Sequence, residues 1–167
     1  MPSTLWSANR IISALLYFSI IILTVWGGLR AINYSIDSKF YKDFLAKWEI
    51  SIRLLNQIQT TWPVFTGNNH VQYMDQLIQH MKNNQIATPD SNTQFSYIYI
   101  MDKIGSGQGE HKIFVLCLPD KLILYDISKE SFERVDRFID SITGPDQGRF
   151  QCHPNNGNSL YTCVWKL

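Results

Sequence analysis

The chain has 167 residues, of which 17% are charged and 13% are aromatic, and its formal net charge is +1. This length and mixed composition predict one modest folded domain beside any long helix, and they are not typical of a low-complexity or disordered protein. No basic block occurs, and no segment interleaves basic with aromatic residues, so we expect no nucleic-acid partner.

Residues 11–29 carry no charge and are bounded by Arg10 and Arg30. At about 1.5 Å per residue, such a run in helical form spans roughly 28 Å, which is close to the hydrocarbon thickness of a bilayer. The run is longer than the apolar part of a signal peptide, and no A-x-A cleavage site follows it. We therefore predict a retained transmembrane helix at residues 11–32, preceded by a short cytoplasmic segment at residues 1–10.

The orientation of this helix rests on two features. Basic residues lie on both sides of it, so the positive-inside rule does not favour a cytoplasmic N-terminus. The short N-terminal segment and a pair of cysteines near the C-terminus do favour that orientation. We predict a single-pass protein of the inner (cytoplasmic) membrane with a periplasmic, extracytoplasmic C-terminal domain. Trp6 and Trp26 are expected to act as interfacial anchors at the two ends of the span.

Residues 33–62 are predicted to continue the helix as an amphipathic stem. No Gly or Pro interrupts this segment, and Pro63 is expected to end the helix at Trp62 because the residue before a proline avoids the α region. Large apolar residues recur at helical spacing and form a stripe, at Ile36, Phe40, Phe44, Trp48, Ile52, Leu55 and Trp62. The stripe is expected either to cover the protein's own sheet or to face a partner subunit, as in a coiled coil.

Residues 63–167 are predicted to form an α+β head on this stem. Two further helices are expected, at 71–81 with Asn69 as N-cap and at 129–142 with Ser128 as N-cap. Apolar, β-branched and aromatic runs predict strands at 95–104, 112–118, 122–127, 149–152 and 161–167. Short loops join the first three strands, which favours an antiparallel meander, and the Gly-rich loop at 105–111 is a hairpin connection in this scheme.

Charged residues alternate on one face of the predicted 129–142 helix. Opposite charges at spacings of three and four favour a solvated face with internal ion pairs. The residues concerned are Glu130, Glu133, Arg134, Asp136, Arg137 and Asp140.

The three cysteines have different expected roles. Cys117 lies in an apolar run and is predicted to be a buried free thiol. Cys152 and Cys163 flank a turn-rich stretch, and two strands joined there bring them within disulfide reach if the domain is extracytoplasmic. The alternative is two free thiols in a cytosolic domain.

No constellation of catalytic or metal-binding residues is evident. No nucleophile-elbow motif occurs, and His70 and His80 are too far apart for a metal pair within one helical turn. Cys152 and Cys163 with a histidine lack the short paired spacing of zinc sites. We therefore expect no enzyme, no cofactor and no metal site.

The order of elements resembles that of type IV pilins and of type II secretion pseudopilins. These proteins have an N-terminal membrane helix that continues as a stem, an αβ loop, an antiparallel meander and a disulfide-closed C-terminal segment. The family's processing motif requires a Gly before the cleavage site and a Glu in the apolar run, and this chain has neither. The resemblance implies that the apolar helix packs against the helices of other subunits, and that the 152–163 segment is an exposed contact region.

We therefore expect a membrane-anchored, non-enzymatic structural subunit of a cell-envelope assembly, such as a pilus-like or secretion machine. Its expected partners are the membrane and other protein subunits. The alternative is a membrane-tethered extracytoplasmic module that binds a small ligand or peptide between the sheet and the 129–142 helix.

Overall fold

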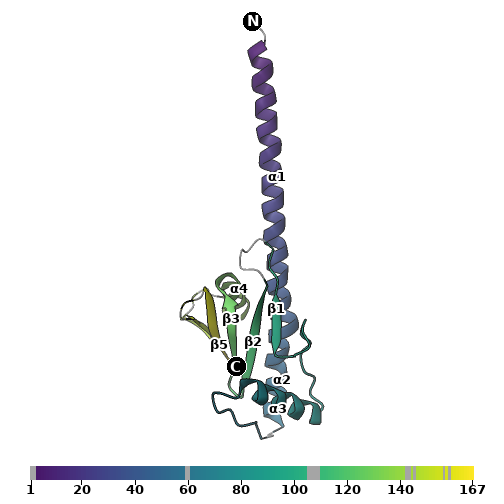
Figure 1. Ribbon diagram of the computed structural model, residues 1–167, viewed down its shortest axis with the longest axis vertical. Helices are drawn as coiled ribbons and strands as arrows, with labels where there is room; N and C mark the ends of the chain where they lie inside the picture. Colours follow the sequence, from purple (N-terminus) through teal and green to yellow (C-terminus); the bar gives the residue numbers. More distant parts are fainter. Residues whose placement is uncertain are drawn as a thin grey trace.

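One long helix runs the length of the molecule, and the head packs against its C-terminal half (Figure 1). The computed structural model describes residues 3–58, 61–104, 110–141, 144, 146–155, 157 and 159–167, with side chains from residue 9. The helix consists of three successive segments, α1 (Ser3–Lys39), η1 (Phe40–Leu45) and α2 (Ala46–Gln57). The α+β fold predicted from the sequence is confirmed.

The η1 segment is a π-helical turn in which the helix widens. A spacing of four residues advances by about 40° around a regular α-helix, so a stripe at 36, 40, 44, 48 and 52 drifts off its face. A π turn accommodates one extra residue and returns the stripe toward the same side. Phe40, Phe44 and Trp48 are all fully buried as a result.

The helix ends at Gln57, five residues before the predicted end at Trp62. The residues that follow include Ile58 and Thr61, and β-branched side chains of this kind extend a helix poorly. The Trp62 indole N–H instead donates back to Asn56 Oδ1 at 3.0 Å. Trp62 is therefore half-buried in the connection after the helix and is not part of the helical stripe.

Five antiparallel strands form the sheet in the order β1-β2-β3-β5-β4. Their bounds are β1 (Ile98–Met101), β2 (His111–Leu118), β3 (Lys121–Ser128), β4 (Phe150–Pro154) and β5 (Leu160–Lys166). The predicted meander of the first three strands is confirmed. Residues 105–109 of the predicted loop lie outside the described residues. β1 is shorter than predicted because Ile98 N–H donates to Phe95 O at 3.1 Å, which makes the preceding residues a turn.

Two shorter helices complete the head, α3 (His70–Asn83) and α4 (Lys129–Asp140). The Ser128 cap of α4 is confirmed, because its hydroxyl accepts from Ser131 N–H at 3.3 Å. Asn69 occupies the predicted N-cap position of α3, and its carbonyl accepts from Tyr73 N–H at 2.8 Å, but its side chain makes no cap hydrogen bond. Its side chain binds the loop before the helix, accepting from Thr66 N–H at 2.9 Å and donating to Val64 O at 2.9 Å.

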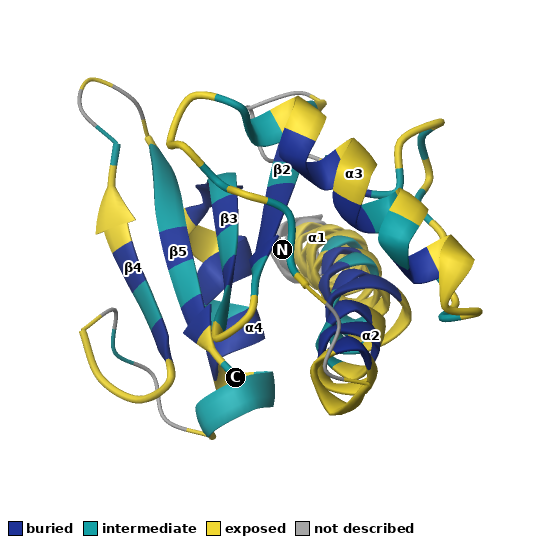
Figure 2. Cartoon of the chain, turned by 90° about the horizontal axis from the view of Figure 1, so that it is seen from below, coloured by how far each residue is buried: buried dark blue, intermediate teal, exposed yellow. Residues whose placement is uncertain are grey.

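The stem stripe is the central part of the core (Figure 2). Five of its residues are at most 1% exposed, namely Phe40, Phe44, Trp48, Ile52 and Leu55. They pack with apolar side chains of the sheet and of α3, so the stripe is covered by the protein's own head. Two roles were open for the stripe, covering the protein's own sheet or facing a partner subunit. The structure shows the first, because these five side chains pack in the core of the head.

Candidate functional site

The N-terminal half of α1 projects away from the head as a bare apolar rod (Figure 1). Its most apolar 18-residue window has a mean hydropathy of 2.1, and none of that window is buried by the rest of the chain. Large apolar side chains are exposed all around it, for example Ile11 at 61%, Leu15 at 61% and Phe18 at 63%. A helix of this length and composition is able to span a membrane.

Two hydroxyl groups within this rod are hydrogen-bonded to the backbone of the helix itself. Ser19 Oγ donates to Leu15 O at 2.8 Å, and Thr24 Oγ1 donates to Ile20 O at 2.8 Å. Hydrocarbon offers no hydrogen-bond partner, so such local bonds remove the cost of placing a hydroxyl there. The hydroxyls are therefore compatible with a membrane span.

Trp26 and Arg30 mark the end of the apolar rod on the side of the head. The Arg30 guanidinium lies over the Trp26 ring, 3.8 Å from its centroid. An aromatic ring stacked on a cation is an amphipathic pair, and such pairs suit the boundary between hydrocarbon and water. Asn33, the residue directly after the predicted span, is buried against the head.

The first contact is a side-chain amide that pairs with the backbone of the β1–β2 connection. Asn33 Nδ2 donates to Ile104 O at 3.0 Å, and Ile104 N–H donates to Asn33 Oδ1 at 3.1 Å. These two hydrogen bonds have the pattern of a hydrogen-bonded residue pair in an antiparallel sheet. They hold the backbone of Ile104 against the helix.

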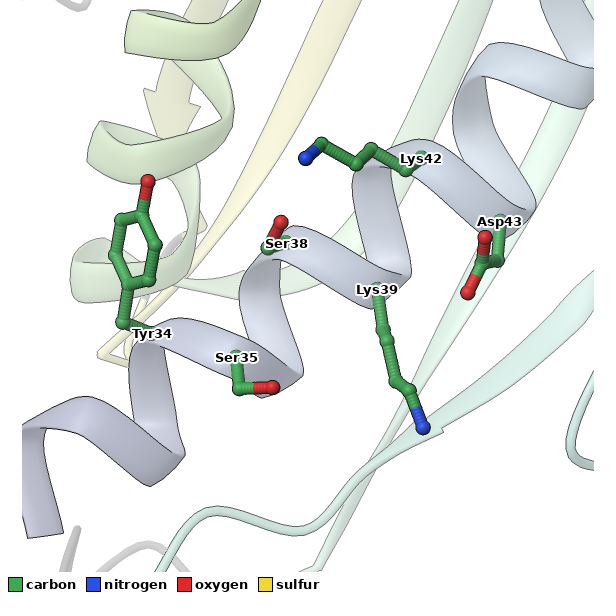
Figure 3. A pocket seen from close by; sticks show the side chains of 6 residues that line it. All are labelled: Tyr34, Ser35, Ser38, Lys39, Lys42 and Asp43. Carbon is green, nitrogen blue, oxygen red and sulfur yellow. The ribbon is translucent and has the colours of Figure 1, made fainter. Parts of the chain in front are cut away.

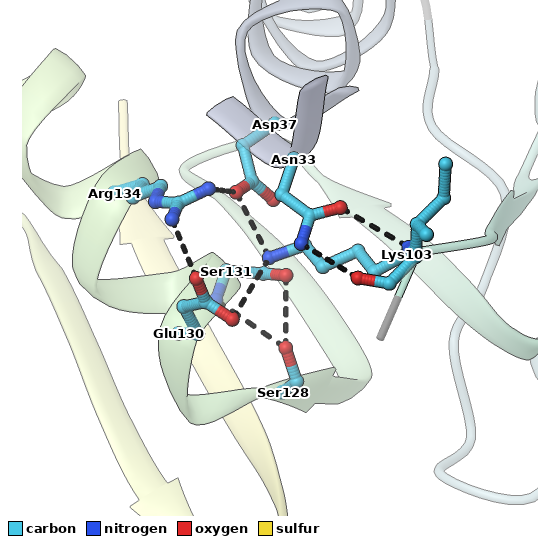
Figure 4. Close-up of polar contacts among 8 residues, drawn as sticks. Asn33, Asp37, Lys103, Ser128, Glu130, Ser131 and Arg134 are labelled. Atoms are coloured by element: carbon cyan, nitrogen blue, oxygen red, sulfur yellow. Dashed lines mark hydrogen bonds and ion pairs between the residues drawn. The ribbon is translucent and has the colours of Figure 1, made fainter. Parts of the chain in front are cut away.

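One turn further, Asp37 is the centre of a buried ion cluster (Figure 4). Its side chain is fully buried, and its Oδ2 lies 2.9 Å from Lys103 Nζ and 2.6 Å from Arg134 Nη1. Glu130 pairs with Arg134 and lies 3.9 Å from Lys103 Nζ, so two anions meet two cations. The cluster joins α1, the β1–β2 connection and α4, three segments far apart in the sequence. We call Asn33, Asp37, Lys103, Glu130 and Arg134 the junction.

The prediction of a solvated charged face on α4 is therefore wrong in part. Arg134 pairs with Asp37 as well as with Glu130, and Asp136 is only 1% exposed. Burial raises the pKa of Asp136, a hydrogen bond from Gly144 N–H lowers it, and the neighbouring Asp140 carboxylate raises it further. Alternating charges predict ion pairs within the helix. They do not show which of the charged side chains are buried against other parts of the protein.

The cysteines behave as predicted. Cys152 and Cys163 form a disulfide between β4 and β5, with their Cα atoms 4.0 Å apart, and Cys117 is a buried free thiol. Burial raises the pKa of the Cys117 thiol well above its usual value. The disulfide closes the C-terminal hairpin.

Side chains also occupy the two edges of the sheet. Beside β1, the Asn92 amide donates to Ile100 O at 2.7 Å and accepts from Ile100 N–H at 2.8 Å. Beside β4, Asp140 Oδ2 accepts from Phe150 N–H at 2.9 Å, and Pro154 has no N–H to offer. Occupied edges of this kind disfavour strand addition by another chain.

The described surface has open hollows, of which two concern the stem and α3. One, of about 220 Å³, is on the stem and is lined by Tyr34, Ser35, Ser38, Lys39, Lys42 and Asp43 (Figure 3). The other, of about 590 Å³, surrounds the start of α3, where His70 Nε2 lies 3.2 Å from Tyr125 Oη. Neither lies between the sheet and α4, where Phe132 and Val135 are buried. In the described part of the chain, no three His, Cys, Asp or Glu side chains converge as metal ligands.

Sequence reasoning missed the junction. Asp37 carried a signal, because it lies three residues before Phe40 and so occupies the apolar face of the helix. A carboxylate on that face needs a buried cation. No local pattern identifies Lys103 or Arg134 as its partners, since Arg134 is 97 residues away.

Comparisons with protein-family models, with curated proteins and with solved structures find no match to this chain. The arguments about function therefore depend on the chain's own geometry.

Proposed function

We propose that this protein is a membrane-anchored, non-enzymatic structural subunit of a cell-envelope assembly of the pilus-like or secretion type. The observation that carries the proposal is one continuous helix with two different halves. Its N-terminal half is apolar and exposed, and its C-terminal half is packed against the head. Because the helix is continuous, the position and tilt of the membrane anchor determine the position and tilt of the head. This coupling suits a subunit that is positioned by its neighbours.

Contact with neighbouring subunits is assigned to the apolar half of α1. The stem stripe is unavailable for this role because the head covers it, and the sheet edges are occupied by side chains. In lipid, helices associate through close packing, and small residues allow the backbones to approach. Gly27 and Gly28 have nothing within 4 Å of their added Cβ positions, so a second helix has room to pack there.

The disulfide supports the orientation that we propose. We propose that the head is periplasmic and that the N-terminus is in the cytoplasm, across the inner membrane. A bridge between Cys152 and Cys163 persists in an oxidising compartment and is rare in the cytosol.

A mass measurement in mild detergent tests the proposal. The intact chain, extracted from its native membrane and analysed by native mass spectrometry, is expected to carry additional copies or other envelope subunits. Replacing Gly27 and Gly28 together with Leu is expected to dissociate these complexes, since bulky side chains keep helix backbones apart. The exposed pair Ile11 and Ile12, replaced with Leu, is the control. A lone monomer at every detergent concentration contradicts the proposal.

The binding-module alternative makes a different prediction for the same preparation. A monomer that retains one small molecule or peptide in constant proportion would favour it. The interface first considered for such a ligand, between the sheet and α4, is filled by side chains such as Phe132.

A further inference from the structure

We propose that the membrane-proximal end of the head rests on the lipid headgroup layer, with Ile104 as the side chain that enters it. This inference rests on the proposed anchoring of α1, and it adds a second, lateral contact between protein and membrane. The partner is the headgroup layer of the same bilayer that holds α1.

The first argument is depth. Asn33 follows Leu29, the last residue of the uncharged run, by four residues, which is roughly 6 Å along the helix axis. The polar layer on each side of a bilayer is about 5–7 Å thick, the difference between the full and the hydrocarbon thickness. Ile104 is hydrogen-bonded to Asn33 and therefore lies at the level of this layer.

The second argument is rigidity. Ile104 is held by two hydrogen bonds to Asn33, and the preceding residue, Lys103, is ion-paired to Asp37. Two consecutive residues of the β1–β2 connection are thus attached to two consecutive turns of α1. Figure 4 shows Asn33, Asp37 and Lys103 close together. The height of Ile104 relative to the anchor is therefore set by the fold.

The third argument is chemistry. Ile104 is 51% exposed, although its own backbone N–H and C=O are both hydrogen-bonded to Asn33. The helix presents two more large side chains at this level, with Ile32 at 46% and Tyr34 at 53% exposure. Trp26 and Arg30, the amphipathic pair at the end of the apolar rod, lie about one to two helical turns before these residues on α1. Apolar and amphipathic side chains near the end of the apolar rod match the chemistry of the interfacial layer.

Continuity with the anchor identifies the occupant as lipid. The exposed apolar surface of α1 runs from Ile11 through Trp26 to Ile32 without leaving the same helix. Once the rod is in a bilayer, the lipid headgroups are already adjacent to Ile104. A docked membrane surface would fix the tilt of the head as well as its height.

A spin label at position 104 tests the inference in the full chain reconstituted into phospholipid vesicles. In the non-reduced protein Cys117 is buried and the other two cysteines are bonded, so an Ile104→Cys variant is labelled at one site. The label is expected to lose accessibility to a water-soluble nickel chelate and to gain accessibility to oxygen. The control is Ile50→Cys, a similarly exposed isoleucine at 57%, roughly 31 Å beyond Leu29.

A third label, at Leu16→Cys inside the apolar rod, separates the two ideas. If the Leu16 label is in lipid while the Ile104 label is as accessible to nickel as the Ile50 label, the headgroup contact is refuted and the anchor stands. If the Leu16 label is also aqueous, the anchor itself is refuted. Ile104 bonds to Asn33 through its backbone, so the substitution leaves the attachment intact.

Discussion

Replacing Asp37 with Asn is expected to lower the free energy of unfolding by about 3 kcal/mol, the lower end of the cost of breaking a buried ion pair. The Lys103 side chain is only 2% exposed and lies 2.9 Å from the Asp37 carboxylate. Without that carboxylate the Lys103 charge loses its nearest anion, and the Glu130 carboxylate lies farther away, at 3.9 Å. The loss is measured as faster labelling of the buried Cys117 thiol, which reacts when the head opens.

Two further variants make the Asp37 experiment specific. Asp43→Asn changes an exposed carboxylate on the same helix and is expected to leave the labelling rate nearly unchanged. In the Asp37→Asn background, Lys103→Met removes the buried positive charge that has lost the Asp37 carboxylate, and it is expected to restore much of the lost stability. Equal labelling rates for Asp37→Asn and the unmodified chain would mean that the junction does not hold the head to the stem.

Replacing Trp48 with Ala is expected to cost about 3–5 kcal/mol of unfolding free energy, as for other large-to-small changes in a core. Trp48 is fully buried, and its indole N–H donates to Ser96 O at 3.2 Å. The variant therefore creates a cavity between stem and sheet and also leaves a carbonyl without its partner. Thermal unfolding followed by circular dichroism, in the same detergent for all variants, measures the effect.

Two controls for Trp48 lie close at hand. Trp48→Phe keeps most of the ring but loses the N–H, so its cost is expected to fall between those of the Ala variant and the unmodified chain. Ile50→Ala truncates a side chain that is 57% exposed two residues away and is expected to change stability by less than about 0.5 kcal/mol. A small effect of Trp48→Ala would show that the stripe does not support the head.

Local patterns in the sequence predict much of this fold. Spacings of three and four mark the buried side of the stem and of α4, and short polar turns identify the hairpin of β2 and β3. The Cys152–Cys163 bridge follows from two strands joined by a turn-rich stretch. These features are readable because each depends on residues that are neighbours in the sequence or on one helical face.

The features that the sequence did not predict depend on residues far apart in the chain, or on local conformational preferences that compete with one another. The π turn keeps apolar residues spaced by four on the side of the helix that faces the sheet. The spacing alone predicts only a regular helix. Asp136 looked like one member of a solvated face, yet the fold buries it beside Gly144. The junction needs three segments to meet, which no local rule anticipates. For the same reason the candidate site, apart from the apolar span, became visible only in three dimensions.

The central claim is that the apolar half of α1 is a contact surface between subunits inside a membrane. A photo-crosslinking amino acid placed in turn at each of residues 14–26, in cells that produce the full chain at its native level, tests this claim most directly. We expect adducts with another copy or with a partner subunit that recur every three to four residues, on the helix face that carries Gly27 or Gly28. Adducts with lipid alone at every position, or none with periodic spacing, would contradict the claim.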